Sequence, residues 1–134
     1  MLDAIDTAIA DGAGVILFPE GTTSAGRDIE PFYPALLEWA ARRSYPVRMA
    51  SLSYQTRDAR RPAHESVCWW GGMTLLPHFR ELCRLRGIEA QLVLHPEPLQ
   101  DSTRTRLASA LRDAMRDRFA PVAPPPRDGP RPPA

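Results

Sequence analysis

A short loop of glycine and hydroxyl-bearing residues holds the groups best suited to chemistry in this sequence. The loop reads Gly21-Thr22-Thr23-Ser24 and follows the apolar run 15–18, which is typical of a buried strand. The carboxyl end of such a strand is where open α/β proteins bind ligands. Gly21 allows a close approach of the backbone, and the hydroxyl and N–H groups after it can surround an anion. The pattern predicts a phosphate or carboxylate seat, to which the guanidinium of Arg27 can add a bidentate contact.

The same loop also fits an ordinary turn. Threonine and serine side chains frequently satisfy nearby backbone groups and bind nothing else, so this alternative stays open. Two catalytic motifs do not match. The serine lies one residue too far from Gly21 for a Gly-x-Ser-x-Gly nucleophile elbow, which makes Ser24 a poor nucleophile. The chain has no Gly-Lys-Ser or Gly-Lys-Thr, so a P-loop is excluded.

Cysteine and histidine side chains give little support for a metal site. Zinc needs paired ligands at short spacing, and the candidates lack such pairs: Cys68, His78, Cys83 and His95. Both cysteines lie in apolar sequence surroundings, so we expect two buried, reduced thiols in a cytosolic protein. We predict that the chain holds no metal.

Helices and strands alternate along the chain and must position the loop. We expect helices at 2–12, 32–43, 74–87 and 101–119, and strands at 14–18, 47–54, 66–70 and 88–95. Gly12 and Gly87 are placed to close helices, Thr74 to cap one, and Pro34 fits a first turn. The strand at 14–18 is apolar on both faces, which favours a parallel sheet. The last helix carries one apolar face: Leu107, Leu111, Met115 and Phe119.

This alternation predicts a three-layer α/β domain over residues 1–119, followed by a proline-rich, disordered tail at 120–134. A length of 134 residues suits one modest core, and a formal charge of +1 argues against nucleic acid as a partner. The N-terminus lacks the basic region of a signal peptide. No apolar run approaches the roughly 20 residues of a membrane-spanning helix, so we expect any membrane contact to be peripheral.

Residues 18–24, Phe-Pro-Glu-Gly-Thr-Thr-Ser, resemble the third sequence block of the glycerolipid acyltransferases, the PlsC-like lysophosphatidic acid acyltransferases. The usual form of that block is Phe-Pro-Glu-Gly-Thr-Arg-Ser. The segment 26–40 is similar to the residues after the block, 45–54 to the fourth block, and 69–79 to a segment common in bacterial members. The resemblance covers residues 2–119.

The resemblance implies that Glu20, Gly21 and Thr22 belong to the acceptor site, where the family holds the phosphate of a glycerol phosphate head group. Together with the loop chemistry, the expected acceptor-binding residues are Glu20, Gly21, Thr22, Thr23, Ser24 and Arg27. Thr23 replaces the usual arginine, a variant associated with bacterial members that include enzymes acylating lyso-ornithine lipids. Phosphate and lyso-ornithine acceptors therefore both stay open. Met49 replaces a usual proline of the fourth block.

The family's catalytic first block, a histidine followed after four residues by aspartate, is absent. The corresponding partners of His64, His78 and His95 are Trp69, Cys83 and Gln100. The second block is also absent, since the family places both blocks before the position of Val15. We therefore expect an incomplete acyltransferase-like domain that lacks its N-terminal strands and helices, has no catalytic residues of its own, and shows no measurable acyl transfer alone.

The resemblance implies an enzyme of membrane glycerolipid biosynthesis that moves a fatty acyl group from acyl-CoA or acyl carrier protein to a lysophospholipid hydroxyl, without a cofactor. It also implies a cytoplasmic protein at the inner face of the cell membrane. Two alternatives remain: a catalytically dead remnant or acceptor-binding module, and an acyltransferase acting on lyso-ornithine lipid.

Two further segments have open interpretations. The segment 69–79, rich in tryptophan and leucine, suits either an acyl groove or membrane-facing surface, or an ordinary buried helix start. The polar loop 56–65 suits contact with anionic lipid through Arg57, Arg60 and Arg61, or simple solvation.

Overall fold

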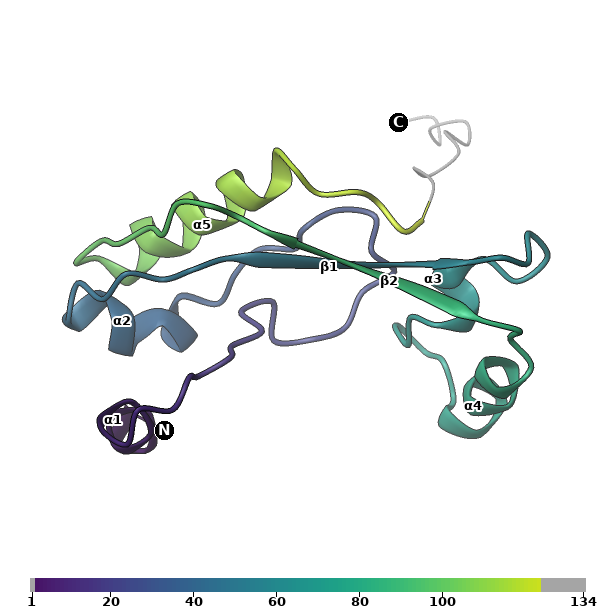
Figure 1. Ribbon diagram of the computed structural model, residues 1–134, viewed down its shortest axis with the longest axis horizontal. Helices are drawn as coiled ribbons and strands as arrows, with labels where there is room; N and C mark the ends of the chain where they lie inside the picture. The colour runs from purple at the N-terminus through teal and green to yellow at the C-terminus, as the bar shows by residue number, and fades with distance from the viewer. Residues whose placement is uncertain (1, 124–134) are drawn as a thin grey trace, which may run out of the picture. The chain divides into compact units, whose positions relative to one another are not determined.

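Helices carry most of the regular structure in the computed structural model of this chain, which describes residues 2–123 (Figure 1). The order is α1 (Leu2–Ala10), the 3₁₀ helix η1 (Pro34–Leu37), α2 (Glu38–Arg42), β1 (Ala50–Thr56), α3 (Ala63–Ser66), α4 (Leu75–Cys83), β2 (Ile88–Leu94) and α5 (Arg104–Arg116). Within these residues, β1 and β2 pair as a two-stranded antiparallel sheet. The mixed α/β composition is confirmed, and the three-layer arrangement stays a prediction.

The described residues form two compact units. The first unit contains residues 2–23, 29–52 and 92–119, and the second contains 24–28, 53–91 and 120–123. Each strand contributes residues to both units. The chain therefore passes between the units at several points, one of which lies after residue 119. The domain boundary predicted there stays a prediction.

The core of the first unit forms where α5 packs against residues 29–41, which include η1 and most of α2. Figure 1 shows α5 running beside α2. Leu37, Leu107 and Leu111 are the most deeply buried large side chains of the core. Met115 packs against this core from the same face of α5, as the spacing predicts. Phe119 also packs against it, but from beyond Arg116, where α5 ends before the predicted residue 119. Met49, at the expected fourth block, is also buried there.

α1 ends as its sequence predicts. Gly12 adopts φ +76°, the Gly12 N–H donates to the Ile9 carbonyl (3.0 Å), and the Ala13 N–H donates to the Ala8 carbonyl (2.8 Å). This pair of bonds is the Schellman arrangement, in which a left-handed residue reverses the chain and satisfies the last carbonyls. The side chain of Asp6 then anchors α1 to α2 by accepting from Trp39 Nε1 at 2.8 Å.

The strand expected at 14–18 is wrong. These residues form no regular secondary structure, and no hydrogen bond joins the backbone N–H or C=O of Val15, Ile16 or Leu17 to any other of the residues 2–123. Ile16 is 82% exposed and Phe18 is 74% exposed. An apolar run predicts burial, yet a strand exists only where a neighbour supplies a hydrogen-bonding ladder. The described residues supply no such neighbour.

The strand expected at 66–70 is also wrong, because side chains there bond to local backbone groups. Ser66 Oγ donates to the carbonyls of Arg61 and Pro62, which supports the short helix α3. The indole N–H groups of Trp69 and Trp70 donate to Met73 O and His64 O. Such local bonds compete with a strand ladder, and they win here.

The remaining helix and strand predictions are confirmed with shifted ends. The predicted helix at 32–43 divides, because Pro34 begins a 3₁₀ turn before α2. α4 begins after Thr74, whose side chain makes no capping bond, and it ends at Cys83 before reaching Gly87. β1 begins later than expected, and Val47 forms only an isolated antiparallel bridge with Leu99.

In the second unit, the first residues of the predicted tail contact Gly26, which lies just after the predicted binding loop. Val122 donates its N–H to the Gly26 carbonyl at 2.7 Å, and Ala123 is buried. Residues 124–134 of the tail predicted to be disordered lie outside the described part. The prediction of a separate tail thus stays a prediction.

Both cysteines are free thiols, as expected. Cys68 is half-buried, and burial raises the pKa of its thiol. The expectation of burial is wrong for Cys83, which is exposed because α4 buries none of its residues within the described structure.

Candidate functional site

The loop predicted to bind an anion begins with a tight turn. The Gly21 N–H donates to the Phe18 carbonyl at 3.1 Å, with Pro19 and Glu20 at the two central positions. Glu20 is not among the residues with positive φ, so the turn is not type II, which needs positive φ at its third residue. Proline at the second position fits a type I turn. One amide of the expected anion seat is therefore already used inside the loop.

The turn is held against the segment that follows it in the first unit. The Tyr33 N–H donates to the Pro19 carbonyl at 2.8 Å, and the Glu30 N–H donates to Glu20 Oε2 at 3.2 Å. Gly21 has φ +66°, and a Cβ there would lie 2.8 Å from the Tyr33 ring. Gly21 is thus required twice, for its backbone conformation and for the space that Tyr33 occupies.

Thr22 and Thr23 are the polar residues of this half of the loop whose side chains are open to solvent. Both are exposed, and no hydrogen bond within residues 2–123 uses their hydroxyl or N–H groups. They offer consecutive donors beside the Glu20 carboxylate. The Glu20 carboxylate itself accepts from the Glu30 N–H and helps to hold the turn in place.

Ser24 and Arg27 belong to the second unit, so the structure does not bring the whole predicted set together in one unit. Ser24 Oγ accepts from the Gly26 N–H at 3.1 Å. At this residue the hydroxyl therefore satisfies a nearby backbone group, as expected for an ordinary turn. The Arg27 guanidinium lies over the Trp70 ring, 5.4 Å from its centroid. Arg27 therefore has a cation–π partner where the sequence predicts a contact to an anion.

The sequence does not predict the parts of Tyr33, Glu30 and Trp70 in this arrangement. Tyr33 and Glu30 lie about ten residues beyond the turn, and the apolar neighbours of Trp70 indicate a strand instead. Their roles arise only in the folded chain, where Tyr33 lies beside Gly21, Glu30 donates to Glu20 and Trp70 lies under Arg27.

The three histidines, His64, His78 and His95, are dispersed along the sequence. His95 is buried, and its backbone N–H donates to the Met49 carbonyl at 3.0 Å. His64 Nε2 lies 3.3 Å from the carboxylate of its neighbour Glu65. Within residues 2–123, no group of three histidine, cysteine, aspartate or glutamate side chains is placed to hold a metal ion. No helix there is long and apolar enough to cross a membrane.

Comparison with known proteins gives one relative of named activity. The chain is 31% identical over 109 residues to the lyso-ornithine lipid O-acyltransferase of Pseudomonas aeruginosa. This chain is a distant homologue of that acyltransferase. The match covers 78% of this chain but 40% of the relative, so the chain spans less than half of that protein's length. No protein-family model and no solved structure matches the chain.

Proposed function

We propose that this chain carries the acceptor-binding part of a lipid acyltransferase. The complete reaction would move a fatty acyl group from acyl-CoA or acyl carrier protein to the hydroxyl of a lyso-lipid. The similarity to the lyso-ornithine lipid O-acyltransferase carries the proposal, and the exposed donors of Thr22 and Thr23 support it. We further propose that this chain forms part of a three-layer acyltransferase fold. In that fold, the N-terminal strands and helices would come from outside residues 2–123.

Lyso-ornithine lipid is the acceptor that the loop favours. Glu20 contributes a carboxylate, and Thr23 stands where an arginine would bind phosphate. An ornithine head group has polar groups that can accept from the threonine donors. A lysophosphatidic acid phosphate would instead lack the arginine that the usual form of this block carries at the position of Thr23.

The transfer step needs a base that these residues do not supply. The acceptor hydroxyl attacks the thioester carbonyl, the hydroxyl proton passes to a base, and the thiol of the donor leaves. In family members with both blocks, the histidine of the histidine–aspartate block takes this proton. The proposal therefore assigns acceptor binding to this chain and proton removal to a partner segment, so the chain alone binds acceptor and does not acylate it.

The test separates binding from turnover. The purified chain is titrated with short-chain lyso-ornithine lipid and short-chain lysophosphatidic acid below their aggregation limits. We expect saturable binding of the ornithine compound that weakens in the isosteric variants Thr22→Val and Thr23→Val. Ser24→Ala is the matched control, because its hydroxyl serves a turn in the second unit. Equal binding by all variants would reject the loop as the acceptor site.

Turnover is measured after co-expression with a polypeptide that carries a histidine–aspartate block, using mass spectrometry of the acylated product. Acylation of lyso-ornithine lipid by the pair, and none by the chain alone, is the expected result. A dead remnant is the second candidate, favoured by the missing block. Acceptor binding without turnover in any such pairing would support it.

A further inference from the structure

One helix of the second unit exposes nearly all its apolar side chains. No residue of α4 is buried, whereas α5 buries Leu107 and Leu111. Leu75, Leu76 and Phe79 are 59%, 80% and 58% exposed. Since residues three to four apart share a helix face, Leu75, Phe79 and Cys83 form one stripe with Leu76 beside it. The interpretation of 69–79 as a buried helix start is wrong for these residues.

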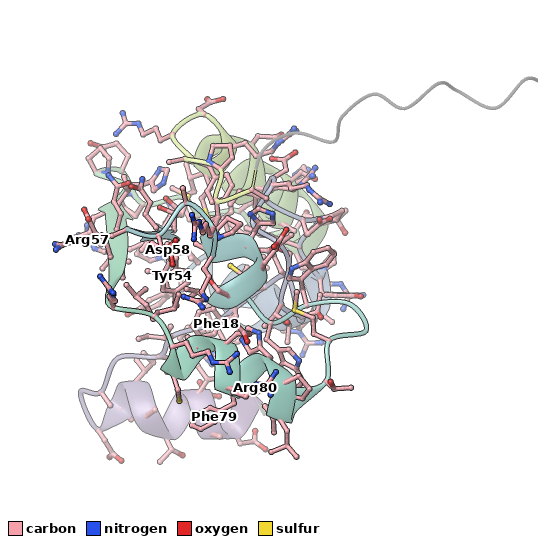
Figure 2. The ribbon with its side chains drawn as sticks, turned by 90° about the vertical axis from the view of Figure 1, so that its right-hand side faces the viewer. Phe18, Tyr54, Arg57, Asp58, Phe79 and Arg80 are labelled. Atoms are coloured by element: carbon pink, nitrogen blue, oxygen red, sulfur yellow. The ribbon has the colours of Figure 1, made fainter. Side chains whose placement is uncertain are left out.

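Arginines border this apolar stripe. Arg80 follows Phe79 and is 69% exposed, and both side chains project from α4 (Figure 2). Arg86 follows the helix and has no ion pair within residues 2–123. Long arginine stems can lie along an apolar surface while their guanidinium groups reach outward. The helix is thus amphipathic, with positive charge at the edge of its apolar face.

A second group of arginines is fastened beside α4. Arg61 Nε lies 3.5 Å from Glu81 Oε2, which joins the loop after β1 to the helix. Arg57 and Arg60 in that loop make no ion pair within the described residues, and Arg57 is labelled in Figure 2. Residues 57–61 and 80–86 together contain six arginines and two acidic residues. This part of the second unit is strongly positive, although the whole chain carries only +1.

We propose that the apolar stripe of α4, with the arginines of residues 57–61 and 80–86, is a docking surface for an anionic lipid bilayer. An exposed apolar stripe bordered by arginine is the pattern of helices that lie in a membrane interface. Trp69 is 47% exposed just before the helix, and tryptophan favours the head-group region. The inference rests on the proposed function in one respect: a lipid acceptor resides in a membrane, where this surface would hold the chain.

Vesicle sedimentation with the full 134-residue chain tests the surface. The probes are phosphatidylcholine vesicles with and without phosphatidylglycerol, at low and high salt. We expect binding to the anionic vesicles that weakens with salt. Leu76→Ser/Phe79→Ser should weaken it at least about tenfold, because apolar contact is lost. Arg80→Gln/Arg86→Gln should weaken it by about fivefold per arginine.

A matched control changes apolar residues that are exposed elsewhere. Ile16→Ser/Phe18→Ser removes similar apolar area from the first unit and should leave vesicle binding unchanged. Circular dichroism verifies that each variant folds like the parent. Equal loss in this control, or no loss in the α4 variants, overturns the proposal. Self-association that disappears in the α4 variants without any vesicle binding would instead assign the stripe to contact between copies, and also overturns it.

Cys83 offers an independent readout, because it lies on the apolar stripe and is exposed. An environment-sensitive fluorophore attached there, in a Cys68→Ser background, should shift to the blue when anionic vesicles are added. An unchanged spectrum despite vesicle binding would place the contact on another surface and overturn the assignment. Neither assay contains an acceptor or an acyl donor, so failure of the proposed function would not imitate failure of this inference.

Discussion

Two features of the structure require glycine at position 21: the positive φ angle and the closeness of the Tyr33 ring. Substitutions should separate the free-energy cost of each. Gly21→Ala places a side chain in the left-handed region, which costs about 1–2 kcal/mol, and brings its Cβ to 2.8 Å from the Tyr33 ring. Gly12→Ala tests the backbone term alone, because Gly12 has φ +76° and no atom within 4 Å of the added Cβ.

Urea unfolding of these variants gives the comparison. We expect Gly21→Ala to lose more free energy of unfolding than Gly12→Ala, and the excess to vanish in a Tyr33→Ala background. An equal loss of unfolding free energy in both backgrounds would show that the Tyr33 ring moves aside without penalty. Tyr33 is 59% exposed, so its ring has room to move into solvent.

The two thiols should differ in reactivity. Burial raises the pKa of Cys68, which reduces its thiolate fraction near neutral pH, whereas Cys83 is exposed on α4. A thiol reagent at neutral pH should therefore modify Cys83 first, with a slower second phase from Cys68. Cys83→Ser should remove the fast phase, and Cys68→Ser the slow one. Indistinguishable rates in the two single variants would contradict the described burial of Cys68.

At the scale of elements, Glu38 ties α2 to α5. It accepts from Arg42 Nε at 2.6 Å and from Arg104 at 2.8 Å. The hydrogen bond from Arg42, followed by that from Arg104, lowers the pKa of Glu38 from its ordinary value of 4.5. A lowered folded-state pKa means that the carboxylate stabilises the fold above pH 4.5, and that this contribution disappears as pH falls through the folded-state pKa.

The pH dependence of unfolding measures this tie. Glu38→Gln should flatten the fall in stability as the pH drops through 4.5 and below, because this side chain takes up a proton on unfolding in the parent but not in the variant. Glu89→Gln, which removes a carboxylate of β2 without a salt bridge in the described structure, is the charge-matched control. A profile for Glu38→Gln that overlays the parent would exclude a stabilising role for these contacts.

The sequence predicts the helices better than the strands, and the reason is physical. Leu107, Leu111 and Met115 repeat at helical spacing, and Gly12 marks a helix end, so local information suffices. A strand depends on a neighbour that the local sequence does not contain, which is why Val15–Phe18 were wrongly assigned. In the site, Gly21 and the turn at Ser24 were recognisable from residue type. The contacts of Tyr33 and Trp70 were not, because they arise only when distant segments meet.

For the whole molecule, the run 15–17, which has no backbone hydrogen bonds within residues 2–123, should govern solubility. Apolar backbone with open hydrogen-bonding groups invites pairing between copies. Ile16→Lys places a charge on the most exposed of these side chains and should reduce aggregation at high protein concentration, measured by light scattering. Thr7→Lys is the control, because it adds the same charge at an exposed position of α1. An equal gain in both variants would indicate a general charge effect.

The same run offers a way to test the proposed assembly with a segment that carries the histidine–aspartate block. The N–H groups of Val15, Ile16 and Leu17 have no hydrogen-bond acceptor within residues 2–123, so their amide protons should exchange with deuterated water almost as fast as in an unstructured peptide. Any polypeptide that supplies a neighbouring strand would slow their exchange. These few amides can therefore report assembly site by site, without a substrate and before any catalytic assay succeeds.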